Sequence, residues 1–500
     1  MKSKLPNIVL IIMDTVGAKH MSLYGYHRKT TPNLERLANY CTVYTRCFAP
    51  ACWTLPSHGS MFTGLYPSQH GAYEGRFLLD DNSQHIATAL KMSGYRTFGI
   101  SSNGLVSPAA GMCPDFDYFK DFGGTFLDLF MRGYNPVDPP EKSEELDKLS
   151  GLLFEGLTKR ERLEKLIKYT LETGEWKAAL ASLARSLRNR LDGLFFPNPM
   201  DNSARFTEKT VKIFPGLLEE GNAQPVFIFI NFFEAHEFYR PPRRWRQFSR
   251  WNDRQLWPIG HSNSKSDKSL LAHFTEINNN LYDDELYYLD HKIGQMWDIL
   301  RNSPAADSTV FILTSDHGEH FGEKNHYGHA LSLYNELLWV PMLIHFPQGM
   351  ADQGPVGKLV SLNDVYATLL DLANSPLPRP ETSSSLLQST GREIALAQYI
   401  YPEQNKMELE GLRKQYELNG LRFSPPIFAV ITDAGKKIIQ RRDQSLEIYD
   451  LRTDMDEKHN LAPAMPSEAL ENIAGMVEVF KVDTAYNDAV KQISEKKILN

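Results

Sequence analysis

Long apolar runs are missing from this 500-residue chain. The first run, residues 8–13, is ended by Asp14, which leaves it too short for a signal-peptide core. No later stretch approaches about 18 uninterrupted apolar residues. We therefore expect no membrane-spanning helix, while peripheral contact with a membrane stays open.

Cysteine and basic charge are also scarce. The four cysteines show no CxxC spacing, which disfavours a zinc or redox site and favours reduced thiols in a cytoplasmic protein. A formal net charge of −7 argues against dedicated nucleic-acid binding, so any anion-binding region must be local. There is no internal repeat and no long low-complexity tract. With 42% apolar and 23% charged residues, the composition is that of an ordinary globular chain.

What the chain does have is an alternation of short β-rich runs with helical patterns, which is typical of a mostly parallel sheet covered by helices. The length exceeds one ordinary core, so more than one domain is expected. The predicted strands are Asn7–Met13, Thr42–Phe48, Arg96–Ser101, Val226–Phe232, Thr309–Thr314 and 340–346, and the predicted helices are 31–39, 57–63, 82–91, 282–301 and 360–372.

Two segments depart from this alternation. At about residues 126–206 we expect a helical insertion, either a lid on the main domain or a helix at a membrane surface. A Pro-, Ser- and Thr-rich linker is predicted near 376–385. Beyond it, a hairpin turn at Asp433 and Gly435, a further strand and a helix at 467–482 indicate a small antiparallel subdomain. We therefore divide the chain into a catalytic domain, 1–385, and a C-terminal α+β subdomain, 386–500.

Two carboxylates, an imidazole and a hydroxyl occupy positions that suit one divalent cation. Asp14 ends the first strand, Asp316 and His317 end a later one, and Thr54 follows the second strand. Ligands gather where loops leave the carboxyl ends of such strands. A cation held there would lower the pKa of the hydroxyl and offset the charge of a transferring group. A helix cap would explain one aspartate alone but not the complete set.

The segments around these residues resemble the sulfatase branch of the alkaline phosphatase superfamily. The segment Thr54-Leu-Pro-Ser-His58, followed by Thr63-Gly64, is similar to the sulfatase element Cys-x-Pro-Ser-Arg with its trailing Thr-Gly. Similar segments extend from residues 6–10 to 446–451, so the resemblance covers most of the chain outside the insertion. It implies a three-layer α/β/α domain with a mostly parallel central sheet, and a smaller C-terminal α+β subdomain with an antiparallel sheet.

Departures from the sulfatase pattern bear on the chemistry. Sulfatases oxidise a cysteine or serine to formylglycine, but the β-methyl group of Thr54 prevents that conversion, so no formylglycine is expected. Asp316-His317 replaces Asp-Asn, and His329 replaces a lysine. The set Asp14, Thr54, Asp316 and His317 is instead similar to the metal set of phosphonate monoester hydrolases, phosphodiesterases and phospho-group transferases. Imidazole in place of carboxamide favours Mn²⁺ or Zn²⁺, with Ca²⁺ still open.

The resemblance also implies roles for neighbouring residues. His236 is similar to the family's leaving-group histidine and would act as a general acid. His329 would bind phosphoryl oxygens, and His58 follows the nucleophile on a helix whose N-terminus favours an anion. Asn103 is a weaker candidate for substrate contact, with a turn residue as the alternative.

Arginine and tryptophan alternate in the segment after His236. Arg240, Arg243 and Arg244 are predicted substrate contacts for a polyanion, a sugar or a lipid headgroup; the alternative is a solvated loop. A second metal ion, bound by histidines and glutamates of residues 319–329, is less expected than a single ion. No Asp-x-x-x-His segment matches such a second site.

These features predict a metal-dependent hydrolase, or a transferase, that acts through a Thr54 phosphoenzyme. Its substrate would be a small anionic ester, a phosphodiester or phosphonate monoester, or a phosphorylated glycan or lipid headgroup. One rival is a sulfatase that works without formylglycine. The other is a catalytically silent relative that binds a glycan or headgroup. A homo-oligomer stays open.

Overall fold

The computed structural model describes residues 5–73, 78–80, 84–108, 111–113, 115–121, 202–251, 253, 268–329, 331–347, 354–387, 391–400, 426–467 and 470–471. The predicted insertion at 126–206 and the predicted helix at 467–482 lie almost entirely outside these residues. Residues 1–123 and 206–500 belong to one compact unit, which contains all the features below except residues 202–205.

An eight-stranded sheet forms the centre of this unit, with the order β10-β2-β9-β6-β1-β5-β3-β4. Its neighbouring strands are parallel except for β9, which runs antiparallel to both β2 and β6. The strands are β1 Asn7–Met13, β2 Thr42–Phe48, β3 Arg96–Ser101, β4 Tyr118–Asp121, β5 Val226–Phe232, β6 Thr309–Thr314, β9 Trp339–His345 and β10 Gly354–Ser361. Five of the six predicted strands therefore have the same bounds in the structure. The sixth, β9, begins and ends one residue earlier than predicted.

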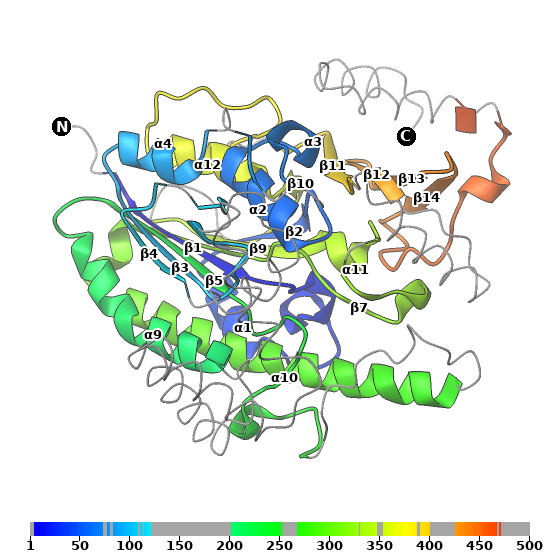
Figure 1. Cartoon of the computed structure of the whole chain (residues 1–500), viewed down its shortest axis with the longest axis horizontal. Helices are drawn as coiled ribbons and strands as arrows, with labels where there is room; N and C mark the ends of the chain where they lie inside the picture. The colour runs from blue at the N-terminus through cyan, green and yellow to red at the C-terminus, as the bar shows by residue number, and fades with distance from the viewer. Residues whose placement is uncertain are drawn as a thin grey trace, which may run out of the picture. The chain divides into compact units, whose positions relative to one another are not determined.

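Helices cover both faces of the sheet, which confirms the three-layer α/β/α architecture (Figure 1). Alternation along β1 shows why, because Leu10 packs into one core and Val9 into the other. The first core also holds α2 Thr54–Thr63, α4 Ile86–Met92 and α12 Asp364–Leu372, and the second holds α1 Pro32–Ala38, α9 Asn202–Glu220 and α10 Lys268–Arg301.

Two helices begin earlier than predicted. Helix α2 starts at Thr54 rather than at residue 57, because Pro56 falls in the first turn, where its missing N–H group leaves no helical hydrogen bond unmade. Helix α10 starts at Lys268 rather than at residue 282. The first correction matters for the chemistry, since it puts Thr54 at a helix N-terminus.

A separate four-stranded antiparallel sheet lies in the C-terminal part, in the order β11-β12-β13-β14. These strands are β11 Ile394–Gln398, β12 Pro426–Thr432, β13 Lys436–Arg441 and β14 Leu446–Asp450. The turn between β12 and β13 has Gly435 at φ +84°, so the predicted hairpin is confirmed. Ala395 and Ala429 pack into the same core as α2 and α12, so this sheet is attached to the large domain through apolar contacts.

The remaining expectations concern cysteine and membrane spans. Cys41, Cys47, Cys52 and Cys113 are all buried, and none of them forms a disulfide. Across the parts of the chain that the structure describes, no helix combines the length and the apolar character that crossing a bilayer demands.

Candidate active site

Asp14 follows β1 at the carboxyl-end edge of the sheet. Its side chain is fully buried, and both carboxylate oxygens are held. Oδ1 accepts a hydrogen bond from the Thr15 hydroxyl at 2.9 Å. Oδ2 accepts from the side-chain amides of Asn103, at 2.8 Å, and Asn231, at 3.3 Å. Because Asn103 comes from the loop after β3 and Asn231 from β5, three strands fix the direction of this carboxylate.

Asp316 and His317 follow β6 at the same edge. Asp316 Oδ1 accepts backbone N–H bonds from Thr15, at 3.0 Å, and His317, at 2.8 Å, whereas its buried Oδ2 has no hydrogen-bond partner. The His317 ring lies with Nδ1 2.8 Å from the Gly318 carbonyl oxygen, which requires the proton on Nδ1 and leaves the Nε2 lone pair available. Burial, with His329 nearby, lowers the pKa of His317 well below its usual range and keeps the ring neutral.

Thr54, the first residue of α2, brings its hydroxyl to these groups from the helix layer that also contains α4 and α12. Its Oγ1 lies 3.3 Å from His317 Nε2, and the residue is only 2% exposed. The Ser57 hydroxyl donates to the Asp316 carbonyl oxygen at 2.6 Å, which braces the first turn of α2 against the loop after β6. The unpaired N–H groups and the dipole at this helix N-terminus favour a negative charge beside the hydroxyl.

The four predicted ligands fit a divalent cation. Ligand atoms of Asp14, Asp316 and His317 all lie within 4.8 Å of one another, and all three residues are buried. Asp316 Oδ2, which has no hydrogen-bond partner, and the unprotonated Nε2 of His317, which faces the Thr54 hydroxyl, carry the electron pairs that a cation would take. Two carboxylates, an imidazole and a hydroxyl form a donor set in which oxygen and nitrogen are mixed, as first-row divalent metals accept.

The pKa shifts of the two carboxyls also indicate a site for a cation. Burial, with the charge of Asp14 nearby, raises the pKa of Asp316 well above its usual range. Burial acts to raise the pKa of Asp14 too, but the imidazoles of His236 and His317 outweigh it, so the Asp14 pKa is lowered. Without a cation, burial and mutual repulsion therefore oppose the ionisation of both carboxyls at once, and a bound cation would allow both to ionise.

His58 lies behind the nucleophile. Its Nδ1 donates to the Thr54 carbonyl oxygen at 3.0 Å and lies 3.5 Å from Asp316 Oδ2. The ring packs edge-on against Phe62 and Phe229, and burial lowers its pKa. These contacts are with the backbone of the nucleophile and with a metal-ligand candidate, so His58 holds the turn that carries Thr54. A catalytic role for its imidazole stays a prediction.

His236 and His329 border the predicted metal ligands. The ring centroids of His329 and His317 are 4.7 Å apart, and those of His329 and His236 are 4.8 Å apart. The His236 ring stacks on Phe233 at 4.2 Å, and its Nδ1 donates to the Glu237 carbonyl oxygen at 2.6 Å. The structure therefore gathers three imidazoles that the sequence separates by up to 93 positions.

The three arginines predicted to contact substrate lie on the surface. Arg240, Arg243 and Arg244 are exposed on the loop after His236. The Arg243 guanidinium lies over the Trp251 ring, 4.5 Å from its centroid, and Arg244 forms an ion pair with Glu208 at 3.1 Å. Contact with substrate stays a prediction for these residues.

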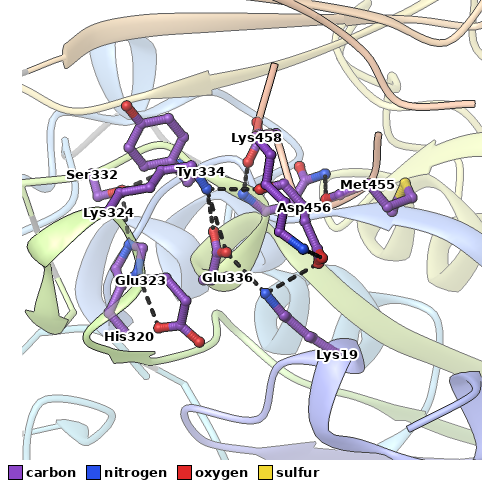
Figure 2. Close-up of polar contacts among 12 residues, drawn as sticks. Lys19, His320, Glu323, Lys324, Ser332, Tyr334, Glu336, Met455, Asp456 and Lys458 are labelled. Atoms are coloured by element: carbon purple, nitrogen blue, oxygen red, sulfur yellow. Dashed lines mark hydrogen bonds and ion pairs between the residues drawn. The ribbon is translucent and has the colours of Figure 1, made fainter. Parts of the chain in front are cut away.

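The segment that carries His329 is tied to the C-terminal part of the chain. Figure 2 shows Lys19 between Glu336 and Asp456, with distances from Nζ to the carboxylates of 3.0 and 3.2 Å. Lys324 reaches Glu336 at 3.4 Å and donates to the Asp456 carbonyl oxygen at 2.9 Å. These ion pairs hold the loop after β6 against residues that follow β14.

Sequence reasoning missed the supporting residues of the site. The sequence predicts Asn103 as a weak substrate contact or a turn residue. Its side-chain oxygen accepts the Leu105 backbone N–H at 3.0 Å, which supports the turn, and its amide also donates to Asp14, which was not predicted. Asn231 was not predicted, although it is the one polar residue in the apolar strand Val226–Phe232, and that exception was the available signal. Thr15 likewise supports both aspartates through its hydroxyl and its backbone N–H.

Comparison with known protein families and named proteins identifies the family of this chain. The sulfatase family matches residues 6–375, and the C-terminal region of N-sulphoglucosamine sulphohydrolase matches residues 322–477. A sulfatase of Formosa agariphila is 24% identical and covers 91% of this chain and 83% of its own. An N-acetylgalactosamine-6-O-sulfatase of Bacteroides thetaiotaomicron is 23% identical, with 96% and 94% covered.

Solved structures share the fold over nearly the whole chain. The phosphonate monoester hydrolase of Agrobacterium radiobacter superposes with a TM-score of 0.62 at 17% identity, covering 95% of this chain and 94% of its own. A protein solved in complex with its substrate D-glucosamine-2-N,6-O-disulfate gives a TM-score of 0.65 at 16% identity, with 98% and 99% covered. The chain thus belongs to the sulfatase family of hydrolases, in the alkaline-phosphatase-like fold.

Proposed function

We propose that this protein is a metal-dependent phosphoester hydrolase in which Thr54 is the nucleophile, acting on phosphodiesters or phosphonate monoesters. The observation that carries the proposal is the convergence of the Thr54 hydroxyl with His317 and two buried aspartates. One carboxylate oxygen of this set, Asp316 Oδ2, has no hydrogen-bond partner. A buried threonine at a helix N-terminus, facing this donor set, is arranged as an activated hydroxyl.

The residue type at position 54 favours phosphorus over sulfur. Threonine has a methyl group on its β-carbon and cannot be converted to formylglycine, so the nucleophile is an ordinary alkoxide. The Asp316-His317 pair is similar to the pattern of phosphonate monoester hydrolases, and two proteins with that name are structural relatives, from Agrobacterium radiobacter and Silicibacter pomeroyi. The described side chains around Asp14 include imidazoles and amides, and the His317 ring is neutral, a set that suits a singly charged ester better than a dianionic monoester.

Each residue has a defined task in this scheme. A divalent cation bound by Asp14, Asp316 and His317 would supply Lewis-acid chemistry, because it lowers the pKa of a neighbouring hydroxyl and offsets charge on phosphorus. The Thr54 hydroxyl releases its proton to solvent water, and its oxygen forms a bond to phosphorus as the bond to the leaving group breaks. His236 gives its proton to the departing alkoxide. Water, or an acceptor alcohol, then cleaves the phosphothreonine and regenerates the hydroxyl.

A second candidate function is hydrolysis of sulfate esters without formylglycine. It is favoured by the names of the relatives, which include an N-acetylgalactosamine-6-O-sulfatase and an N-acetylglucosamine-6-O-sulfatase of Bacteroides thetaiotaomicron. The same constellation would serve, with Thr54 attacking sulfur. The nature of the atom attacked therefore decides between the two candidates.

The test compares hydrolysis of bis(p-nitrophenyl) phosphate, p-nitrophenyl phosphate and p-nitrophenyl sulfate by one preparation. The protein is stripped of metal and refilled with Mn²⁺, Zn²⁺ or Ca²⁺, with Thr54→Ala as the blank and Thr54→Ser as the conservative variant. We expect diester turnover that requires metal, falls by about 10³-fold or more in Thr54→Ala and persists in Thr54→Ser. Sulfate turnover alone would select the second candidate, and silence with metal bound would indicate a binding protein or a transferase.

A further inference from the structure

Glu319 is a buried carboxylate beside the site that the proposed chemistry does not use. It lies two residues after His317 and is 3% exposed. Its Oε1 is 3.2 Å from His329 Nδ1, and its Oε2 accepts a hydrogen bond from the Tyr239 hydroxyl at 3.0 Å. Tyr239 is itself buried and follows His236 in the loop after β5. One carboxylate therefore joins the loops that carry all three imidazoles of the site.

The position of the His329 ring suggests what its contact with Glu319 does. With Nδ1 directed at Glu319, the opposite edge of the ring carries Nε2. The ring centroid lies 4.7 Å from that of His317 and 4.8 Å from that of His236. The ring thus packs against both a predicted metal ligand and the predicted general acid.

The backbone around His329 does little to hold the ring in this orientation. The residue before it, Gly328, has φ +74°, and among the residues that the structure describes the two-residue strand β8 Tyr327–Gly328 pairs with β7 His320–Phe321 alone. The His329 side chain is 16% exposed rather than packed on every side. An imidazole in such a place can rotate about its χ2 bond, which is a soft torsion, unless a hydrogen bond fixes it.

We propose that Glu319, held by Tyr239, is a positioning residue that fixes the His329 ring with Nε2 directed at the substrate anion. The inference rests on the proposed function, in which His329 binds a non-bridging oxygen. Carboxylates that orient a histidine act through that ring, and their loss typically reduces activity by about 10- to 100-fold. Glu319 would touch neither substrate nor metal.

A double-mutant cycle separates positioning from general support of the fold. The variants are Glu319→Ala, His329→Ala and the double variant, with kcat and KM measured on whichever ester the wild type hydrolyses. We expect Glu319→Ala to lower kcat/KM by about 10- to 100-fold and to cause no further loss when His329 is already absent. Losses that multiply in the double variant would overturn the proposal.

Milder variants and a spectroscopic readout keep the test decisive if Glu319→Ala folds poorly. Glu319→Gln keeps a carbonyl oxygen for Nδ1–H and should recover part of the activity, and Tyr239→Phe should cause a smaller loss than Glu319→Ala. Histidine-selective ¹⁵N NMR, with His329 assigned through His329→Ala, should show the proton on Nδ1 in the wild type and a tautomer mixture in Glu319→Ala. An unchanged tautomer would overturn the proposal.

Failure of the proposed function gives a different result. Ester hydrolysis that persists in Thr54→Ala would refute the proposed function, whereas the NMR measurement of the His329 tautomer would still test the role of Glu319.

Discussion

At the scale of single residues, the two oxygens of the Asp316 carboxylate have different tasks. Oδ1 accepts two backbone N–H bonds that hold the side chain in place, while Oδ2 is buried without a partner. Such an atom costs about 1–3 kcal/mol unless something binds it. The metal-free protein is therefore expected to carry a local instability that a cation removes.

Asp316→Asn is predicted to have opposite effects with and without metal. Burial raises the pKa of Asp316, so this group stabilises the fold at low pH and the contribution is lost as the carboxyl ionises at higher pH. The amide avoids that loss, and the metal-free variant should melt above the metal-free wild type at pH 8. Saturating Mn²⁺ should stabilise the wild type by about 4 kcal/mol at 1,000 times Kd and the variant hardly at all. Equal metal-dependent shifts of Tm in both proteins would contradict the ligand assignment.

Glu234 offers a pH prediction away from the metal ligands. It follows β5, accepts a hydrogen bond from the Thr207 hydroxyl and is buried, and burial raises its pKa from 4.5 to about 7. Its stabilising contribution should be complete below pH 4.5 and lost as pH rises through 7, a change of up to about 3 kcal/mol. Urea unfolding of the wild type and Glu234→Gln at pH 5 and pH 8 measures it. The two proteins should differ in the pH dependence of their stability, and parallel curves would argue against a raised pKa.

At the scale of elements, the loop after β6 approaches the backbone of α11 Asn335–Leu338 so closely that a side chain at Gly318 cannot fit, whereas Gly216 has room for one. A Cβ on Gly318 would lie 2.1 Å from the Glu336 carbonyl oxygen, whereas one on Gly216, an exposed position in α9, would meet nothing within 4 Å. Gly318→Ala should destabilise the protein by about 1–3 kcal/mol and weaken metal binding, because Gly318 follows His317. Gly216→Ala should stabilise the protein by about 0.5–1 kcal/mol. Thermal unfolding with and without Mn²⁺ reports both, and similar Tm values for the two variants would refute the close approach.

Elements also show how far the sequence could predict this molecule. Apolar runs such as Val226–Phe232 identified strands to the residue, since burial on both faces leaves little ambiguity. The antiparallel direction of β9 was not predicted, because an apolar run does not indicate which way a strand runs relative to its neighbours. The Asp and His ligands came from their places after strands and from a family resemblance. The bonds of Asn103 to Asp14 and of Tyr239 to Glu319 were not predictable, because they depend on the three-dimensional meeting of loops far apart in sequence.

At the scale of the whole molecule, a buried ion pair helps to join the C-terminal sheet to the rest. Lys437 on β13 and Glu457 after β14 are 2.6 Å apart with fully buried side chains, and Glu457 also accepts the Asn335 backbone N–H. Asn335 begins α11 Asn335–Leu338, which leads into β9 of the large sheet. The pair therefore ties the C-terminal strands to the segment that follows His329.

Removing one partner should be far more costly here than at the surface. Lys437→Met leaves Glu457 buried without its counter-charge and should cost about 3–5 kcal/mol. Arg36→Ala, which breaks the exposed pair with Asp298 at 2.6 Å, should cost about 1 kcal/mol or less. Urea unfolding of both variants provides the comparison. Equal losses would mean that the C-terminal sheet contributes little to the stability of the whole unit.

The bond from the Thr15 backbone N–H to Asp316 spans 301 positions of the chain, and it has a consequence for biosynthesis. At about 5–20 residues per second, a ribosome releases the start of β1 about 15–60 s before it completes β6. Strand β1 is central in the large sheet, and both of its neighbours, β5 and β6, are made later. The nascent chain thus carries the buried apolar strand β1 without its full set of partners throughout that interval. We expect newly made molecules to depend on chaperones that shield such a segment until its partners emerge.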